Sequence, residues 1–594
     1  MINFPTIKKS IVTSVNTLFE GDNIQDLIVI ENTKKDFEGD LTLVVFSLLK
    51  LSKKSPEKTA EFIGNYLLEN ENYFEDFNIV KGFLNLKIKQ KYWLTFFKGW
   101  LEEDNYGFVT KPTGELYMVE YSSPNTNKPL HLGHLRNIFL GDSVVSLLKA
   151  AGHKVVKTQI INDRGIHICK SMVAWQKFGN GETPMSSNLK GDHLVGKYYV
   201  IFDKVYKQEI KDLIESGITE KEAKLKAPIL IEAQKMLLLW ENEDSKVRAL
   251  WEKMNEWVYS GFDKTYKDLN VKFDHLYYES ETYRLGKEVV QQGVENGVFY
   301  LKEDSSIWSS FTNDNLDDKL LVRSDGTSVY MTQDIGTAVQ RYNDYPNLSG
   351  IIYTVGNEQN HHFKVLFNIL KKLNYNWASN CFHLSYGMVE LPEGKMKSRE
   401  GTVVDADELL NSVINEAKSL TSERGFLEEL SEKEILDICK KIGNSGLKYF
   451  LLKVDPKKKM SFNPKETIDL SGHTGPFIQY TFVRIKSLLN KYEDLNSEFR
   501  IENLKLNPKE LEVLKWISNF SDVLAQSAKD LSPYLLANYL YSLVKSYNSF
   551  YQDHPIITEK EDALRNFRIQ MSKLVAEIIE KGMKILGIEM PERM

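Results

Sequence analysis

The chain has 594 residues, of which 42% are hydrophobic and 27% are charged, and its formal net charge is -6. This length and composition are typical of a globular protein with roughly three or four domains, and the acidic balance alone does not support a nucleic-acid-binding role. No run of about 18 apolar residues is present, so we expect no membrane span. Three widely spaced cysteines argue against disulfides and structural zinc and favour the cytoplasm.

Residues 1 to 108 are predicted to form a small α+β domain of their own. Ile7, Ile11 and Val15 recur at helical spacing, and residues 81–88 alternate between apolar and polar side chains as a half-buried strand does. Nothing in this segment is typical of a catalytic site.

A strand, a polar turn and a helix follow one another between residues 116 and 152. Residues 116–121 are apolar and aromatic, like a buried strand of a parallel sheet, and the turn after them contains Pro129, which suits a first helical turn. Apolar residues then recur at helical spacing up to Gly152, a typical helix stop. His131 and His134 are therefore predicted at a helix N-terminus, above the carboxyl end of a strand.

This position fits a phosphate group, because the helix dipole and the unpaired amide groups of the first turn favour an anion. Gly133, between the two histidines, leaves room for a ligand to approach the backbone. Two other interpretations exist. The pair could be capping or solvated histidines, or it could bind a metal, although it lacks a third ligand motif and the i, i+4 spacing of helical zinc sites. The strand-turn-helix context favours nucleotide binding.

Further buried strands are predicted at residues 155–161, 351–356 and 382–391. Parallel strands joined by helices predict a Rossmann-like, doubly wound α/β sheet. The segment from about 180 to 290 has a helical pattern and is strongly charged, which predicts a helical insertion between the two halves of the sheet. From about 405 onward nearly all of the chain is predicted to be helical.

Residues 123–137 include the motif His131-Leu-Gly-His134 and resemble the extended HIGH-type signature of arginyl-tRNA synthetases, which are class I aminoacyl-tRNA synthetases. The resemblance implies three domains: an appended tRNA-contacting domain at 1–108, a Rossmann-like catalytic domain at 109–465, and an all-α anticodon-binding domain at 466–594. Within the catalytic domain it implies the insertion near 180–290 and a helical segment near 405–465 that contacts the tRNA stem.

The implied reaction uses ATP with Mg²⁺ to activate L-arginine as arginyl-adenylate and then transfers it to the 3′ end of tRNA(Arg), in a monomeric enzyme. His131, Gly133 and His134 would bind ATP, and the two histidines would act in catalysis. A loop resembles the KMSKS-type segment that neutralises pyrophosphate, one residue shorter than the general pattern: Lys395, Met396, Lys397 and Ser398. We expect Lys128 to share the catalytic work of Lys397. By itself, such a loop is most often solvated surface.

Recognition of a guanidinium group requires carboxylates in matching geometry and an aromatic surface along the aliphatic stem. Tyr330 and Asp334 are four residues apart and would share one side of a helix start. The resemblance assigns arginine binding to Glu120, Asn125, Tyr330, Asp334 and Gln359. The family pattern usually has arginine before the equivalent of Asp334, whereas this chain has Gln333.

Aromatic residues of the C-terminal region suit the stacking of unpaired anticodon bases, although aromatics at helical spacing more often belong to a core. Residues 472–480 and 591–594 resemble the anticodon-binding domain of the same family, which implies tRNA contacts by Gln479, Tyr480, Tyr547 and Tyr551. Two alternatives stay open: a class I synthetase for another amino acid, and a non-catalytic tRNA-binding relative.

Overall fold

The computed structural model describes residues 4–19, 24–34, 36–103, 105–311, 317–390, 404–423, 430–463, 466–492 and 504–594. The chain divides into two compact units. The first consists of Met1–Phe108, Tyr480–Leu524 and Tyr539–Lys581, and the second of Val109–Gln479, Ala525–Asn538 and Gly582–Met594. Among the helices in the described ranges, none combines the length and the apolar composition required to cross a bilayer.

The first unit contains a four-stranded antiparallel sheet. Its strands, in spatial order, are β1 (Val29–Asn32), β2 (Leu41–Val44), β4 (Phe83–Ile88) and β3 (Phe74–Val80). The strand predicted at 81–88 begins only at Phe83, because Lys81 and Gly82 form the two-residue turn of a hairpin, both with positive φ. Ile7, Ile11 and Val15 are fully buried, as their helical spacing predicts.

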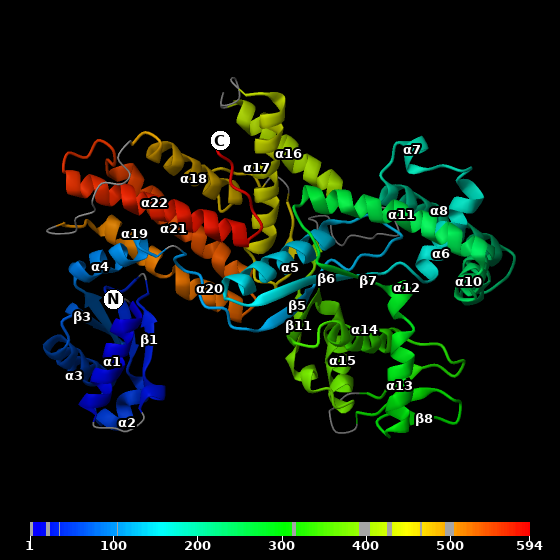
Figure 1. The fold of residues 1–594 in the computed structure, drawn as a ribbon, viewed down its shortest axis with the longest axis horizontal. Coiled ribbons are helices and arrows are strands. Elements are labelled where there is room, and N and C mark those ends of the chain that lie inside the picture. The colour runs from blue at the N-terminus through cyan, green and yellow to red at the C-terminus, as the bar shows by residue number, and fades with distance from the viewer. Residues whose placement is uncertain are drawn as a thin grey trace. The chain divides into compact units, whose positions relative to one another are not determined.

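Helices of the N-terminal part of the chain cover this sheet, and the C-terminal part of the chain is also helical (Figure 1). α3 (Pro56–Asn70) packs against β3 and β4, and α1 (Phe4–Leu18) packs against α3. The other N-terminal helices are α2 (Leu49–Ser52) and α4 (Gln90–Leu101). The C-terminal helices are α18 (Gly475–Leu489), α19 (Pro508–Ser518), α20 (Phe520–Lys529), α21 (Pro533–Asp553) and α22 (Asp562–Ile585).

The second unit is built on a five-stranded parallel sheet. Its strands, in spatial order, are β12 (Cys381–Tyr386), β11 (Leu348–Gly356), β5 (Leu116–Glu120), β6 (Lys154–Ile161) and β7 (His275–Tyr278). Strand β5 lies in the middle, and the order reverses between β5 and β11. This reversal is the topological switch point at which open α/β sheets bind ligands. The predicted Rossmann-like, doubly wound fold is confirmed.

Helices of the second unit pack on this sheet and form its core. α5 (Leu132–Ala150) joins β5 to β6, while α14 (Tyr330–Asp344) and α15 (Asn360–Lys372) flank β11 in the chain. Met118 of β5, Ile351 of β11, Ile335 of α14 and Ile369 of α15 are buried in one apolar cluster. Around it lie α12 (Glu279–Thr282), α13 (Leu285–Glu295) and a small sheet of β8 (Tyr300–Leu301), β9 (Ile307–Ser309) and β10 (Lys319–Val322).

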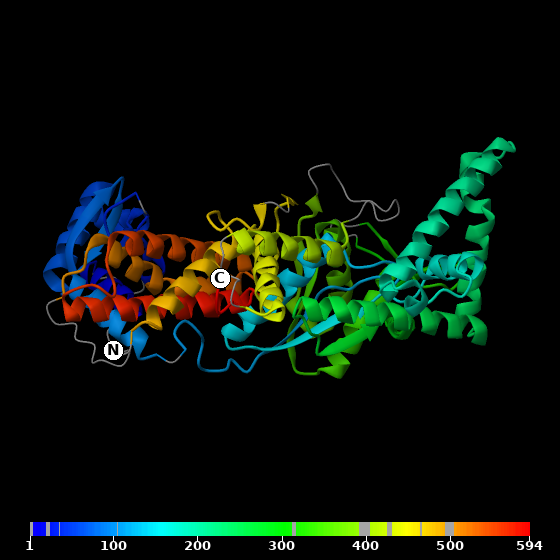
Figure 2. The ribbon, with the colours of Figure 1, turned by 90° about the horizontal axis from the view of Figure 1, so that it is seen from above.

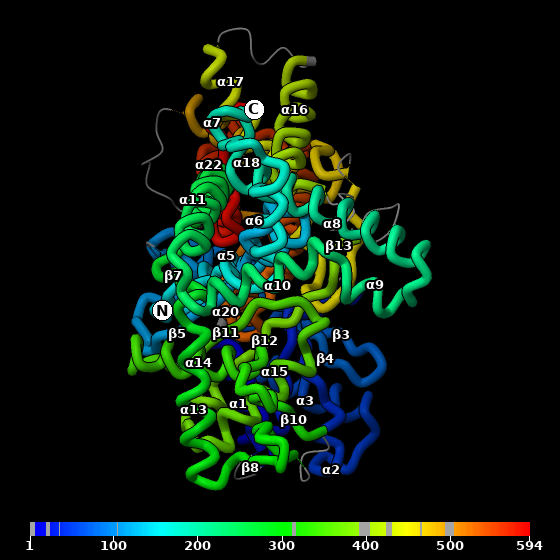
Figure 3. Tube along the Cα trace, turned by 90° about the vertical axis from the view of Figure 1, so that its right-hand side faces the viewer, coloured from blue at the N-terminus to red at the C-terminus, as the bar shows by residue number. Residues whose placement is uncertain are grey.

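Between β6 and β7 the chain is helical. The segment begins with α6 (Ile166–Phe178) and α7 (Pro184–Ser187), and continues through α8 (Gly191–Glu215), α9 (Glu220–Lys226), α10 (Pro228–Glu241) and α11 (Ser245–Asp268). Figures 2 and 3 show α9 and the adjoining end of α8 projecting outward from the rest of this segment. The last helix of this segment ends at Asp268, before β7 begins to pair with β6 at His275.

After the sheet, the chain forms β13 (Val389–Glu390), α16 (Ala406–Glu423), α17 (Glu432–Leu452) and β14 (Met460–Ser461). β13 and β14 pair in parallel. α16 and α17 pack against each other and both contact α5, so this part of the second unit lies beside the helix that carries the two histidines.

Candidate active site

The two histidines of the motif cap the N-terminus of α5. The N–H of Gly133 donates to Nδ1 of His131, and the N–H of His131 donates to Nδ1 of His134, both at 3.1 Å. Because Nδ1 of each ring is an acceptor, the proton of each neutral imidazole lies on Nε2. The ring centroids are 3.8 Å apart. The capping interpretation and the nucleotide interpretation are therefore compatible, since capping leaves one N–H on each ring as a donor.

Both imidazoles are held neutral by their surroundings. Burial and the charge of Lys128 lower the pKa of His131 to about 3. Burial, with His131 and Lys128 beside it, lowers the pKa of His134 well below its usual value. Neutral rings avoid the cost of burying a charge and still donate from Nε2. The pair thus offers two uncharged donors at the positive end of a helix.

Asn137 and Gly141 fix α5 to the strand ends at the switch point. Asn137 Nδ2 donates to the Thr354 carbonyl (2.7 Å) and to the Tyr386 hydroxyl (3.1 Å), and its Oδ1 accepts from the N–H of Ser122. A Cβ at Gly141 would lie 2.3 Å from the ring of Tyr121, so only glycine permits this approach. One amide therefore holds the carboxyl ends of β5, β11 and β12 together around the start of α5.

Glu120, the last residue of β5, forms a buried ion pair with Arg341 of α14. The side chains are 8% and 1% exposed, respectively. The guanidinium of Arg341 also lies 5.1 Å from the Tyr277 ring and 5.4 Å from the Tyr353 ring. Although burial opposes it, Glu120 and Tyr353 raise the pKa of Arg341 above its usual value. The other carboxylate oxygen of Glu120 accepts from Ser123 Oγ at 3.4 Å.

The remaining predicted arginine-binding residues lie in turns and at helix starts. Asp334, just after the first turn of α14, pairs with Nε2 of His362 near the start of α15. Tyr330 is 74% exposed. Gln359 is exposed at the end of the 3-10 helix Asn357–Gln359, directly before α15. Asn125 is exposed in the turn after β5. The contact between Asp334 and His362 joins the starts of the two helices that flank β11.

Three family models together match most of the chain. The model described as tRNA synthetases class I (R), catalytic domain, matches residues 101–463. The arginyl tRNA synthetase N terminal domain model matches residues 5–88, and the DALR anticodon binding domain model matches residues 478–594. The chain belongs to the arginyl-tRNA synthetases.

Relatives and solved structures agree with this assignment. An arginine–tRNA ligase of Flavobacterium psychrophilum is 54% identical over 99% of both chains, and one of Bacteroides thetaiotaomicron is 52% identical over 98% of both. Among solved structures, the arginyl-tRNA synthetase of Thermus thermophilus matches with a TM-score of 0.78 at 22% identity, and that of Plasmodium falciparum with 0.77 at 20%, each over 100% of both chains. At these identities the two structures support the fold.

In this arginyl-tRNA synthetase, the lysine loop at Lys395, Met396, Lys397 and Ser398 lies outside the described residues, but both of its flanks are fixed to α5. On one side, the buried Arg136 of α5 donates to the carbonyls of Gly387 (2.7 Å) and Lys458 (2.9 Å). On the other, the N–H of Leu132 donates to the Val404 carbonyl (3.1 Å). The helix that carries the histidines therefore also holds both approaches to the loop.

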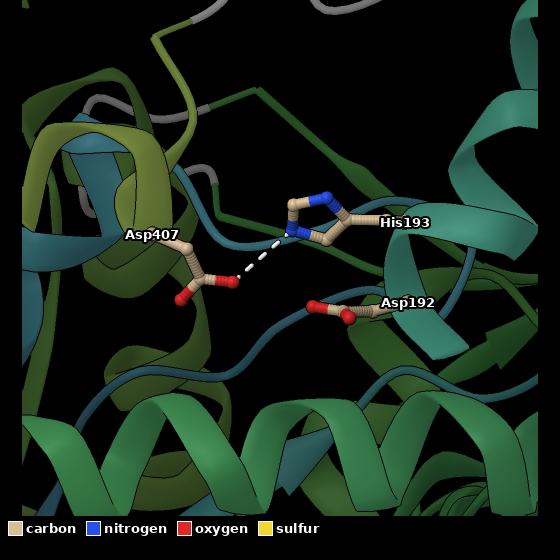
Figure 4. Close-up of side chains that lie close together, drawn as sticks. All are labelled: Asp192, His193 and Asp407. Atoms are coloured by element: carbon tan, nitrogen blue, oxygen red, sulfur yellow. Dashed lines mark hydrogen bonds and ion pairs between the residues drawn. The ribbon is translucent and has the colours of Figure 1, made fainter. Parts of the chain in front are cut away.

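A polar cluster joins the start of α8 to the start of α16 in this synthetase (Figure 4). Nε2 of His193 lies 3.1 Å from Asp407 and 3.3 Å from Asp405, and the hydrogen bond with Asp407 raises the pKa of His193. Lys190 makes ion pairs with Asp407 and with the buried Asp192. Asp192, His193 and Asp407 are close enough to share a metal ion, but the lysine already neutralises the carboxylates. We assign the cluster a structural role.

The predicted tRNA contacts differ in exposure. Gln479 is fully buried and donates to the carbonyls of Lys441 (3.3 Å) and Glu589 (2.7 Å). Tyr547 is also fully buried, and its hydroxyl donates to Ser572 at 2.8 Å. Tyr480 and Tyr551 are half-buried and lie 5.6 Å and 4.5 Å from the guanidinium of Arg484. Gln479 and Tyr547 thus have packing partners within the protein, whereas the two other tyrosines keep exposed surface.

Sequence reasoning missed several charged residues of this synthetase. Arg341 and His362 pair with predicted arginine-binding carboxylates. Glu279 begins α12 at the carboxyl end of β7, and Arg136 supports the flank of the lysine loop. Only for Glu279 did the sequence offer a clue, because this residue directly follows the aromatic residues at the end of a strand. The pairings themselves join distant parts of the sequence.

Proposed function

We propose that this synthetase activates L-arginine with Mg²⁺-bound ATP and transfers the arginyl group to the 3′ end of tRNA(Arg), acting as a monomer in the cytoplasm. The observation that carries the proposal is the pair of neutral histidines at the switch point, each with its Nε2–H as a donor. The carboxylate of Glu120 lies at the end of the adjacent strand. Donors for phosphate and an acceptor for a cationic amino acid therefore belong to the same edge of the sheet.

The first chemical step is attack by the arginine carboxylate on the α-phosphorus of ATP, with pyrophosphate as the leaving group. Negative charge then grows on the phosphate oxygens, and His131 and His134 stabilise it by donating from Nε2. Each such donor contributes on the order of 3 kcal/mol of transition-state stabilisation. Lys128 and Lys397 neutralise the pyrophosphate, with Gly133, Lys395, Met396 and Ser398 completing the ATP site. A ribose hydroxyl of tRNA then attacks the carbonyl carbon of the arginyl-adenylate, which forms the ester, breaks the bond to the phosphate and releases AMP.

Glu120, Asn125, Tyr330, Asp334 and Gln359 bind arginine in this proposal. Tyr330 supplies the exposed aromatic surface along which the aliphatic stem lies. Asp334 is the acceptor best placed for a cation to reach, because its side chain is 42% exposed and its partner is a single histidine. Binding of arginine would compete with His362 for this carboxylate.

The residues near the histidines also fit Mg²⁺ carried by ATP. A cavity of about 260 Å³ beside His131 is lined by Lys128, Asp405 and Glu408. Carboxylate oxygens are the protein ligands that Mg²⁺ prefers, and it commonly uses only one or two of them when phosphates supply the rest. When bound, the ion would neutralise negative charge on the phosphates; Glu408 would hold it, because Asp405 is already engaged by His193 and by the first N–H groups of α16.

For tRNA, we propose contacts by Tyr480 and Tyr551 in the anticodon-binding domain at 466–594, together with the appended domain at 1–108; the catalytic domain extends over 109–465. The exposed surface of both tyrosines supports stacking on unpaired bases. Gln479 and Tyr547 would support these residues from the core, because they are buried.

ATP–pyrophosphate exchange and tRNA charging test this proposal. The full chain is incubated with ATP, Mg²⁺ and each of several amino acids; exchange is measured with and without tRNA(Arg), and charging is measured with tRNA(Arg) present. We expect charging with arginine alone. Charging with another amino acid, or none with arginine, would contradict the proposal. Gel filtration of the same sample tests the monomer.

A further inference from the structure

The side chain of Gln333 connects Arg164 with Glu279, next to Asp334. In the amide orientation that satisfies both neighbours, its nitrogen donates to Oε1 of Glu279 (3.1 Å) and its oxygen accepts from Nη1 of Arg164 (3.2 Å). The three residues belong to separate elements: Glu279 begins α12, Gln333 lies in the first turn of α14, and Arg164 follows β6. A guanidinium and a carboxylate are thus joined through one amide.

Arg164 is held firmly in its place. Its guanidinium lies 4.1 Å from the Tyr283 ring and 5.5 Å from the Trp240 ring, and Nη2 forms an ion pair with Glu241 at 2.8 Å. Its side chain is only 10% exposed. Aromatic faces and an ion pair fix a planar guanidinium in one orientation. The Nη1 end of this fixed, positively charged guanidinium therefore faces Gln333.

Glu279 is a buried carboxylate whose ionisation depends on its neighbours. Its pKa is raised to about 7, chiefly by burial and also by the charges of Asp163 and Asp334, while Arg164 acts in the opposite direction. These are the charged groups that face Glu279 from the loop after β6 and from α14. Loss of Arg164 would leave Glu279 with two carboxylate neighbours and the Gln333 amide, and would favour its protonated form.

We propose that Arg164 is a positioning residue for arginine recognition, because through Gln333 it keeps the carboxylate of Glu279 charged and oriented beside Asp334. When Glu279 is ionised, the arginine site carries two negative charges near α14, which suits a substrate with a guanidinium group. The inference rests on the proposed role of Asp334. It also explains the glutamine before Asp334, since Arg164 supplies the guanidinium from a neighbouring element.

This proposal predicts how the KM for arginine depends on pH. In the wild type, the KM for arginine falls as pH rises through about 7, because Glu279 becomes ionised there. In Arg164→Gln the inflection moves to higher pH. If the pKa rises by about one, the ionised fraction at pH 7 falls from about one half to about one tenth, and the KM rises about fivefold. Above about pH 8.5 the KM values for arginine of the two enzymes converge.

The experiment measures the KM for arginine and for ATP by pyrophosphate exchange, with tRNA present, from about pH 6 to about pH 8.5. Arg248→Gln is the matched control, because Arg248 also packs on Trp240 (3.5 Å) but hydrogen-bonds to the Trp240 carbonyl instead of to Gln333. We expect a shifted arginine profile in Arg164→Gln, a wild-type profile in Arg248→Gln, and an unchanged KM for ATP in both.

The double variant Arg164→Gln, Gln333→Arg returns a guanidinium to the neighbourhood of Glu279 from the other side. We expect it to restore the arginine profile toward wild type, which a purely structural role of Arg164 would not allow. An unshifted profile in Arg164→Gln overturns the proposal, and so does a shifted profile that the double variant leaves unchanged. If Arg164→Gln fails to fold, Arg164→Lys, which keeps the charge and not the fork, is measured instead, and a wild-type profile is expected.

Asp334→Ala separates this inference from the proposed function. If Asp334→Ala leaves the KM for arginine unchanged, the assigned arginine site is itself wrong. If Asp334→Ala raises that KM strongly while Arg164→Gln shifts nothing, only the role of Arg164 is overturned.

Discussion

Glu120 and Arg341 form an ion pair in which both side chains are almost fully buried. Replacing Arg341 with methionine leaves the carboxylate of Glu120 without its cation, and removing one partner of such a pair costs about 3–5 kcal/mol. We expect Arg341→Met to lower the free energy of unfolding by this amount, measured by urea denaturation. The double variant Glu120→Gln, Arg341→Met should lie closer to wild type, because it leaves no unpaired charge. A loss below about 1 kcal/mol in the single variant would show that the pair is not what holds Glu120.

His131→Asn separates the two roles of His131. Asparagine is a good N-cap and its Oδ1 replaces the acceptor Nδ1, so the helix start stays intact. The Nε2–H donor is lost. We expect stability at neutral pH to stay within about 0.5 kcal/mol of wild type. The kcat of pyrophosphate exchange should fall on the order of a hundredfold. Unchanged exchange would remove His131 from the catalytic assignment, and a large loss of stability would mean that the cap had not been replaced.

The depressed pKa of His131 predicts a loss of stability in acid. The unfolded chain binds a proton on this ring near pH 6.5, whereas the folded protein does so only near its pKa of about 3. The contribution of the neutral His131 ring to the free energy of unfolding is therefore complete above about pH 6.5. It falls as pH decreases, and the loss reaches about 1.4 kcal/mol at pH 5.5. Urea denaturation at pH 7.5 and pH 5.5 should show wild type losing about this much more stability than His131→Asn. Equal losses in the two proteins would contradict a neutral, buried His131.

Asp334→Ala should affect arginine use and leave stability nearly unchanged. The side chain is 42% exposed and its partner is His362, so little folding energy depends on it. Binding of the guanidinium, in contrast, loses one of its two carboxylate partners when Asp334 is absent, at a cost of about 3–5 kcal/mol in kcat/KM for arginine. The KM for ATP should stay close to wild type. Steady-state kinetics with each substrate varied, together with a melting curve, measure both effects.

Local patterns were sufficient to predict the histidine site and four strands of the parallel sheet, whereas β7 lies within the segment from about 180 to 290 that was predicted to be helical. The four predicted strands are short apolar runs bounded by polar turns, and His131 and His134 lie at a helix start that the following periodicity predicts. Pro129 was expected in the first helical turn, but it precedes the N-cap His131 and lies outside the helix. Strand 81–88 was wrong by two residues, because alternation does not reveal that Lys81 and Gly82 form a turn. Such boundaries depend on backbone conformation, which composition indicates only weakly.

The partners of the predicted site residues could not be predicted. Arg341 pairs with Glu120, and His362 with Asp334, across elements that meet only in the folded protein. Burial was equally inaccessible: Gln479 and Tyr480 are neighbours in the sequence, yet the first is fully buried and the second half-buried. A helical pattern indicates that one face is covered, but the neighbouring helices decide which residue lies at the edge of that face.

The attachment of both flanks of residues 391–403 to α5 has a consequence in chain entropy. Gly387 is held by Arg136, and Val404 by Leu132, so the ends of this thirteen-residue segment are fixed by the fold and not by the segment itself. The entropy of closing such a loop varies as (3/2)RT ln n, and one residue more or less in about thirteen changes it by only about 0.1 kcal/mol. The places of both flanks are therefore set by contacts of α5, and one residue more or less between them hardly changes the free energy of folding.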